Sequence, residues 1–138
     1  MTITFTTESI RLLTLFENIT NVSVRDCFTT NDVIYYVVEE GKIGLAIGKN
    51  GSSIKNVERI VGKKVKVYEY SSDIETFVKN LIPQCKEVKI VNNEDSIKVE
   101  IKVNKINRGL VIGRGGEKIK TYKKILKRVH NISDIQVK

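Results

Sequence analysis

Residues 109–119 read GLVIGRGGEKI, and residues 44–54 read GLAIGKNGSSI. The two stretches lie 65 positions apart, and each places two glycines three residues apart within the same apolar frame. An apolar half-helix that is stopped by glycine and restarts at a second glycine predicts a tight turn between two helices. Because a pattern this specific occurs twice in 138 residues, the chain is expected to contain two copies of one unit.

The repeated unit extends upstream of the glycines. Ile34, Tyr36 and Val38 recur with the period of two that is expected of a half-buried strand, and the second copy has the same alternation. A shorter β-prone run precedes each of these strands, and a polar turn, TTND or NNEDS, joins the two, so each copy predicts a hairpin. With the last strand of each copy, the predicted strands are 21–28, 33–39 and 64–70, then 86–91, 96–103 and 133–138.

Apolar residues at helical spacing flank the hairpin in each copy. In the first copy this spacing runs from Ile10 to Ile19, and in the second copy a helix is predicted within 73–82, with Ser72 and Asp73 as candidate caps. After the second glycine, an amphipathic helix is expected to bury one apolar face. Its expected buried residues are Ile54, Val57, Ile60 and Val61 in the first copy, and Ile119, Tyr122, Ile125, Leu126 and Val129 in the second.

Both copies therefore have the order helix, strand, strand, short helix, glycine turn, helix, strand. This order predicts an α+β fold with two consecutive domains, residues 1–71 and 72–138. A unit of this size is near the lower limit for an independent core, and almost no linker separates the copies. We therefore expect the two domains to pack against each other as a rigid tandem.

The composition is that of a soluble globular protein with a polyanionic partner. Apolar residues make up 41% of the sequence, and the formal net charge is +8. Residues 73–138 hold fifteen basic and eight acidic side chains, whereas residues 1–72 hold nine and eight. Within 105–128, nine basic residues accompany one acid, Glu117, so nearly all of the positive field comes from one stretch.

Several other classes of protein are disfavoured. No apolar run approaches the roughly 18 residues that span a bilayer. The start, MTITFTTESIRLLTLF, has neither a basic n-region nor a small-residue cleavage site, so a cytoplasmic protein without membrane contact is expected. Cys27 and Cys85 lie far apart and His130 is the only histidine. We therefore expect reduced thiols and no metal site or cofactor.

The glycine turn suits an anion. The first N–H groups of the restarting helix lack partners within the helix and lie at the positive end of its dipole. Lys49 in one turn and Arg114 in the other add a full positive charge beside these groups. Because glycine has no Cβ, another backbone can also come close. The turn is therefore suited to the phosphates of a flexible chain.

The pattern I/V-G-x-x-G-x-x-I between two helices resembles the KH domain. The leading helix, with the last strand at the end, resembles its type II arrangement, αββααβ. Two such units over the whole chain resemble the archaeal NusA-like transcription termination and antitermination factors. The resemblance implies binding of single-stranded, nascent RNA and a role in transcription elongation, termination or antitermination. RNA polymerase and the ribosome are the candidate host machines, and we expect a monomer.

In KH domains the GxxG loop clamps the backbone of about four unpaired nucleotides, and the bases lie across an adjacent groove. The resemblance implies two such loops here, surrounded by basic side chains. The implied RNA-binding residues are Gly48, Lys49, Asn50, Gly51, Lys55, Lys105, Arg108, Gly113, Arg114, Gly115, Gly116, Lys118 and Lys120. Ile47 and Ile112 are expected under the groove or in the core. Because the first copy is nearly neutral and has Asn50 where the second has Gly115, its affinity is expected to be lower.

Three other functions compete with a role in transcription. The stretch G-L-A-I-G-K at 44–49 has three residues between its glycines rather than the four of a Walker A loop, and no catalytic constellation can be assembled around one histidine. The chain is therefore not expected to be an enzyme. A helix-turn-helix DNA reader fits less well, because glycines at both ends of the turn favour capture of a flexible single strand. A KH-type ribosome-associated or ribosome-assembly factor is the main alternative within the resemblance.

Overall fold

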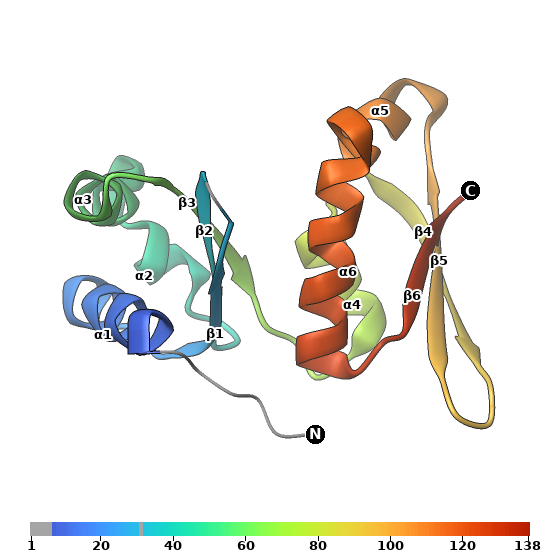
Figure 1. Ribbon diagram of the computed structural model, residues 1–138, viewed down its shortest axis with the longest axis horizontal. Helices are drawn as coiled ribbons and strands as arrows, with labels where there is room; N and C mark the ends of the chain where they lie inside the picture. The colour runs from blue at the N-terminus through green and yellow to red at the C-terminus, as the bar shows by residue number, and fades with distance from the viewer. Residues whose placement is uncertain (1–6, 31) are drawn as a thin grey trace. The chain divides into compact units, whose positions relative to one another are not determined.

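A computed structural model of the protein describes residues 7–30 and 32–138. Residues 1–6, which begin the N-terminal stretch assessed above, and Asn31, in the predicted turn TTND, lie outside the described residues. The chain divides into two compact units, Met1–Ser71 and Ser72–Lys138. Both units have the order of elements that the repeat predicts (Figure 1). Rigid packing of the two units stays a prediction.

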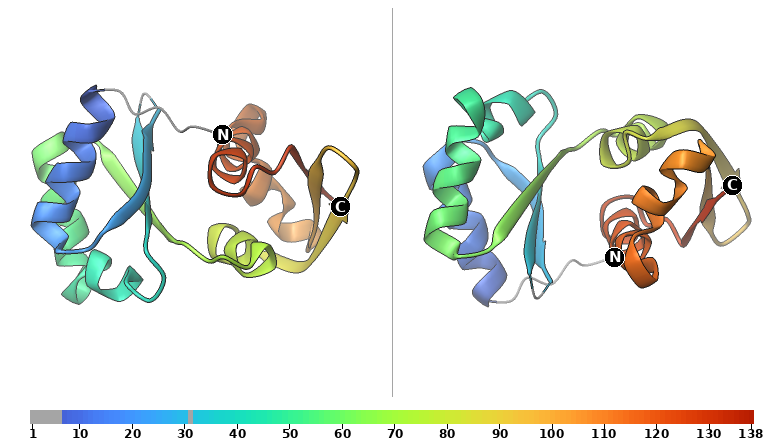
Figure 2. Two further views of the ribbon diagram at one scale, coloured as in Figure 1. Left: turned by 90° about the horizontal axis from the view of Figure 1, so that it is seen from below. Right: turned by 90° about the horizontal axis from the view of Figure 1, so that it is seen from above.

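In the first unit, helices cover one face of a sheet that has three strands in the described part of the chain (Figures 1 and 2). Its elements are α1 (Thr7–Thr20), β1 (Val24–Thr29), β2 (Val33–Val38), α2 (Ile43–Ile47), α3 (Ser52–Val61) and β3 (Lys64–Glu69). The central strand β2 is antiparallel to β1 and parallel to β3. Parallel neighbours need a crossover connection, and α2, the glycine turn and α3 form it.

The core of the first unit lies between the sheet and its helices. Ile34, Tyr36 and Val38 of β2 are buried in it, as predicted. Tyr35 and Val37, which lie between them, are buried as well, so β2 is not the half-buried strand that the alternation predicted. The ring of Tyr36 stacks on that of Phe16, with 4.1 Å between centroids. The hydroxyl of Tyr36 donates a hydrogen bond of 2.9 Å to the carbonyl oxygen of Leu12, so α1 is fixed to the central strand by a polar contact as well as by packing. Burial raises the pKa of Tyr36 well above its ordinary value.

The second unit repeats this arrangement. Its elements are α4 (Ile74–Leu81), β4 (Cys85–Asn92), β5 (Ile97–Val103), α5 (Arg108–Ile112), α6 (Glu117–His130) and β6 (Asp134–Val137). The central strand β5 is antiparallel to β4 and parallel to β6. The register of the hairpin shifts opposite Val38 in the first unit and opposite Val103 in the second, so the bulge occurs at equivalent positions. The α+β fold is therefore confirmed for both units.

Of the two candidate caps, Ser72 and Asp73, the structure shows Asp73 as the N-cap of α4. Its Oδ2 atom accepts hydrogen bonds from the backbone N–H of Thr76, at 3.0 Å, and from the Thr76 hydroxyl, at 2.6 Å. These two bonds hold the pKa of the Asp73 carboxyl below its ordinary value. A carboxylate at this position also lies at the positive end of the helix dipole.

Burial of the helix after the glycine turn differs from the prediction at one residue. Ile60, expected in the core, is 56% exposed, whereas its counterpart Ile125 is fully buried. The two helices also differ in length, since α3 has 10 residues and ends at a left-handed Gly62, whereas α6 has 14. Of the other expected core residues, Val57, Tyr122, Ile125 and Leu126 are buried, and Ile54, Val61, Ile119 and Val129 are partly buried.

Candidate nucleic-acid interface

The two glycine turns have nearly the same backbone conformation. Gly48 has φ 78° and ψ 172°, and Gly113 has φ 76° and ψ 171°, in a region that is essentially restricted to glycine. The N–H of Gly48 closes α2 on the carbonyl oxygen of Gly44 at 3.0 Å, and the N–H of Gly113 closes α5 on that of Gly109 at 2.9 Å. The repeat in the sequence is therefore a repeat in the geometry.

The first glycine of each turn is also required by close packing. A methyl group at Gly48 would lie 2.8 Å from the backbone nitrogen of Ser53, and one at Gly113 would lie 2.9 Å from that of Lys118. Real side chains essentially never come so close. The absence of Cβ therefore lets the first turn of α3 or α6 pack directly on the glycine, which sets the angle between the two helices.

The third position of the turn explains why asparagine can replace glycine. Asn50 has φ 56° and Gly115 has φ 63°, so both adopt the left-handed conformation. Asparagine adopts this conformation more readily than other residues with a side chain. The exchange of Asn50 for Gly115 consequently leaves the backbone conformation of the turn nearly unchanged.

At the start of each helix, one N–H group is already bonded within the turn: that of Ser52 donates to the carbonyl oxygen of Lys49, and that of Glu117 to the carbonyl oxygen of Arg114. Neither α3 nor α6 has a side chain that caps its N-terminus. Lys49 and Asn50 in one turn, and Arg114 and Gly115 in the other, are exposed. An uncapped helix start with a basic side chain beside it is favourable for a phosphate, because the helix dipole and the N–H donors act together.

The predicted basic residues of the second unit converge on its turn. Lys105 lies in a short 3-10 turn, η2 (Lys105–Asn107), and Arg108 is the first residue of α5. Lys118 and Lys120 lie in the first turn of α6, and all four side chains are exposed. Figure 1 shows α5 beside the start of α6, so the elements that carry these residues meet at the turn. In the first unit only Lys55, in the first turn of α3, corresponds to this group.

A basic stripe on α6 extends beyond the predicted site residues, of which it contains only Lys120. Lys120, Lys124 and Lys127 follow one another at spacings of four and three residues, so they share the helix face that is opposite the core. Each is exposed and, within the part of the chain that the structure describes, forms no ion pair. Lys123 differs, since its ammonium lies 3.2 Å from Asp134. The helical spacing was the signal that could have predicted the stripe.

The Ile residues beside the turns are not in the deepest part of the core. Ile47 is 38% exposed, which excludes a core position, and Ile112 is half-buried. The preceding residues, Ala46 and Val111, are the fully buried ones. Placement of both isoleucines at a base-binding groove stays a prediction, and their partial exposure is compatible with it.

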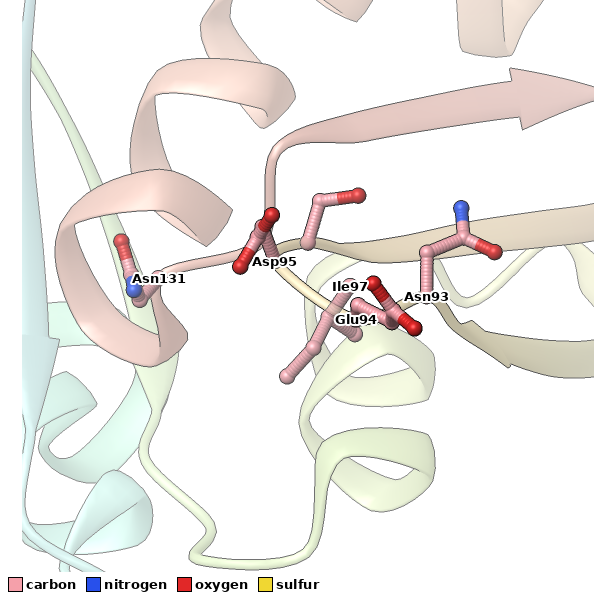
Figure 3. A pocket seen from close by; sticks show the side chains of 6 residues that line it. Asn93, Glu94, Asp95, Ile97 and Asn131 are labelled. Atoms are coloured by element: carbon pink, nitrogen blue, oxygen red, sulfur yellow. The ribbon is translucent and has the colours of Figure 1, made fainter.

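A pocket at the opposite end of the second unit contains two acidic residues. The pocket is lined by Asn93, Glu94, Asp95, Ser96, Ile97 and Asn131 (Figure 3). Asn131 caps the C-terminus of α6, and the glycine turn precedes its N-terminus, so the length of the helix, about 20 Å, separates the two. The acidic side chains of this pocket repel phosphates.

Two further findings concern the described residues as a whole. Between residue 7 and residue 138, Asn31 excepted, no helix is long and apolar enough to cross a membrane. The same residues include no group of three His, Cys, Asp or Glu side chains that is arranged to hold a metal ion.

Known proteins share both the sequence and the fold. A family model of the KH domain matches residues 13–81. A protein of Methanocaldococcus jannaschii named "Probable transcription termination protein NusA" is 37% identical over 134 residues, which cover 96% of this chain and 73% of the relative. A protein of Halococcus morrhuae with the same name is 30% identical, with 99% of each chain covered.

A solved structure supports the same assignment. The "Crystal structure of APE1850" matches the fold with a TM-score of 0.82 and 33% sequence identity, and covers 97% of this chain and all of its own. The similarity thus extends over both units in sequence and in structure. The chain belongs to the family of KH-domain, NusA-like transcription termination proteins.

Proposed function

We propose that the protein binds single-stranded RNA through its two glycine turns and acts on the nascent transcript during elongation, termination or antitermination. The observation that carries this proposal is the pair of uncapped, exposed turns with the same backbone conformation. Family membership supports it, since the relatives are named for transcription termination.

The proposed mechanism is capture of the RNA backbone. Phosphates approach the start of α3 or α6, where no side-chain cap competes for the N–H groups that follow those of Ser52 and Glu117. Lys49 or Arg114 then adds a charge-assisted contact, and Lys55, or Lys118 with Lys120, extends the contact into the following helix. The bases lie beside the turn, next to Ile47 or Ile112. Recognition then depends on a flexible strand, because a duplex would hold its bases away from this surface.

The experiment that tests the proposal is a competition assay. A fluorescein-labelled single-stranded RNA of mixed sequence is bound to the full chain and followed by fluorescence anisotropy. Unlabelled RNA of the same sequence is expected to displace it, whereas duplex DNA of equal length is expected to be at least tenfold less effective. If duplex DNA competes as well as the RNA does, backbone capture of a single strand is wrong and a helix-turn-helix interpretation is favoured.

The host machine is tested separately. Crosslinking in cells, followed by identification of the bound RNA and of the co-purified proteins, is expected to recover nascent transcripts together with RNA polymerase. Recovery of ribosomal RNA and ribosomal proteins instead would contradict the role in transcription and favour the ribosome-associated alternative, while leaving RNA binding intact.

A further inference from the structure

Three neutral side chains that form hydrogen bonds lie in the first turn and at the start of α3, and the repeat replaces each of them in the second unit. The first unit has Asn50, Ser52 and Ser53, and the corresponding residues of the second are Gly115, Glu117 and Lys118. Within the described part of the chain, none of the three neutral side chains forms a hydrogen bond. Their amide and hydroxyl groups are therefore available to a ligand.

The exposed surface of the two turns differs accordingly. Asn50 and Ser52 are exposed, and Ser53 is half-buried. The hydroxyl oxygen of Ser53 lies against the first glycine, since a methyl group at Gly48 would be 2.5 Å from it. In the second unit, the atom nearest to a methyl group at Gly113 would be the Cγ atom of Lys118, at 2.8 Å. A polar oxygen in one unit thus corresponds to an aliphatic carbon in the other.

The fold does not require the side chains of Asn50 and Ser52. Gly115 adopts the left-handed conformation of Asn50 without any side chain. Ser52 is the first residue of α3 and follows the N-cap, Gly51, and no side chain caps this helix. Alanine would favour the helix more than serine does. Neither backbone conformation nor helix capping therefore explains these two residues.

The chemistry of these groups matches a ribose. The side chains of asparagine and serine both donate and accept hydrogen bonds, whereas Arg114 and Lys118 only donate and the carboxylate of Glu117 only accepts. Phosphate oxygens of a nucleic acid only accept. The 2′-hydroxyl of a ribose both donates and accepts, and it distinguishes RNA from DNA at a given site. Because each ribose is bonded to the phosphates on either side, its hydroxyl lies close to a captured phosphate.

We infer that Asn50 and Ser52 determine the preference for RNA over single-stranded DNA, by hydrogen bonds to the 2′-hydroxyl of a nucleotide that the first turn holds. The second turn has no side chain that both donates and accepts, and it contributes affinity without this preference. This inference rests on the proposed function, since it assigns sugar recognition to one of the two turns that capture the phosphates.

The test compares one base sequence on two backbones. A fluorescein-labelled single-stranded RNA and the 2′-deoxy strand with the same bases, uracil included, are each titrated with the full chain, and the Kd is measured by anisotropy. The wild type is expected to bind the RNA about fivefold more tightly, as one net hydrogen bond would provide. Contacts to base edges do not produce this ratio, because the bases are identical. Equal affinity for the two strands would overturn the inference.

Asn50→Gly combined with Ser52→Ala removes both side chains and keeps the backbone conformation. Ser53 is left unchanged because its hydroxyl packs against Gly48. The Kd for RNA should rise about fivefold and that for the deoxy strand less than about twofold, so the ratio approaches one. The reciprocal variant, Gly115→Asn, should raise the ratio, because the second turn gains an amide. If the double variant weakens binding of both strands by the same factor, the inference is wrong.

A further variant separates the inference from the proposed function. Arg114→Asp combined with Gly115→Asp impairs the second turn, so the remaining binding depends more on the first. Affinity for both strands should fall, and the preference for RNA should increase. If these aspartates leave both Kd values unchanged, the proposed function fails. If they weaken binding of both strands without increasing the preference for RNA, the proposed function stands and the assignment of sugar recognition to the first turn is wrong.

Discussion

The two units share a backbone but not an electrostatic environment. Gly48 and Gly113 differ by 2° in φ and 1° in ψ, so the turns are equivalent as scaffolds. Around the first turn the basic side chains are Lys49 and Lys55, whereas the second turn is followed by a helix of 14 residues with a basic face. The difference indicates that geometry and charge act separately. The fold fixes the backbone of both turns, and the exposed basic side chains around each turn determine its expected affinity for RNA.

The largest expected effect concerns charge reversal in the turns. Arg114→Asp with Gly115→Asp should raise the Kd for single-stranded RNA by about 100-fold, because a charge-assisted contact is replaced by repulsion within a positive field. Lys49→Asp with Asn50→Asp should raise it by less than about tenfold. Anisotropy titrations of both variants measure the ratio. Equal losses would refute the asymmetry between the units.

The next prediction concerns stability, in which the two units should behave alike. Gly48→Ala and Gly113→Ala should each lower the free energy of unfolding by about 2 kcal/mol or more, because both φ/ψ values belong to glycine and a helix nitrogen blocks the methyl group. Urea unfolding followed by circular dichroism measures the change. Gly115→Asn is the matched control and should stay within about 0.5 kcal/mol, because Asn50 already has that conformation. A stable Gly113→Ala variant would contradict the close packing of α6.

A smaller effect is expected for the basic stripe on α6. Lys124→Gln with Lys127→Gln should reduce the slope of log Kd against log salt by up to about 1.4, at roughly 0.7 for each phosphate contact that is lost. Glutamine keeps the helix propensity of lysine. Arg59→Gln, at the position in α3 that corresponds to Lys124, is the control and should leave the slope unchanged. An unchanged slope in the lysine variant would limit the phosphate contacts to the turn.

The smallest effect concerns the cap of α4, which has no equivalent described in the first unit. Because its pKa is lowered by folding, Asp73 stabilises the helix above the ordinary carboxyl pKa of about 3.9 and loses this contribution as the pH falls through the lower folded value. Asp73→Ala should therefore lower the Tm slightly at neutral pH. Thermal scans between neutral and acidic pH should show that the difference in Tm between this variant and the wild type disappears in strong acid. A difference in Tm that does not change with pH would mean that the Asp73 carboxylate is not its cause.

Sequence reasoning succeeded where a repeated pattern had one structural solution. Two glycines three residues apart, after an apolar half-helix and before an amphipathic one, predicted the short helix, the turn and the long helix in both units. It was wrong at Ile60, because periodicity places a residue on the apolar face of a helix but does not report whether another element covers that part of the face. Packing of the two units against each other stays a prediction.

The site was less predictable than the fold. The residues of the turns could be predicted from the motif, but three properties of the site are visible only in the three-dimensional structure. These are the contact that excludes a methyl group at Gly48, the open space at Gly44, and the exposure of Leu45 and Leu110. The sequence alone does not distinguish these glycines from one another. The atoms around each glycine show whether the fold requires a residue without a side chain there.

The stacked ring of Tyr36 has a practical consequence. The chain has five tyrosines and no tryptophan, and Tyr35, Tyr36, Tyr68 and Tyr70 belong to the first unit, leaving Tyr122 for the second. Intrinsic tyrosine emission will therefore report mainly on the first unit. Because burial raises the pKa of Tyr36, the phenolate absorbance of this residue above about pH 10 should appear only when that unit opens. The intact chain thus contains a spectroscopic probe that distinguishes the unfolding of one half from that of the other.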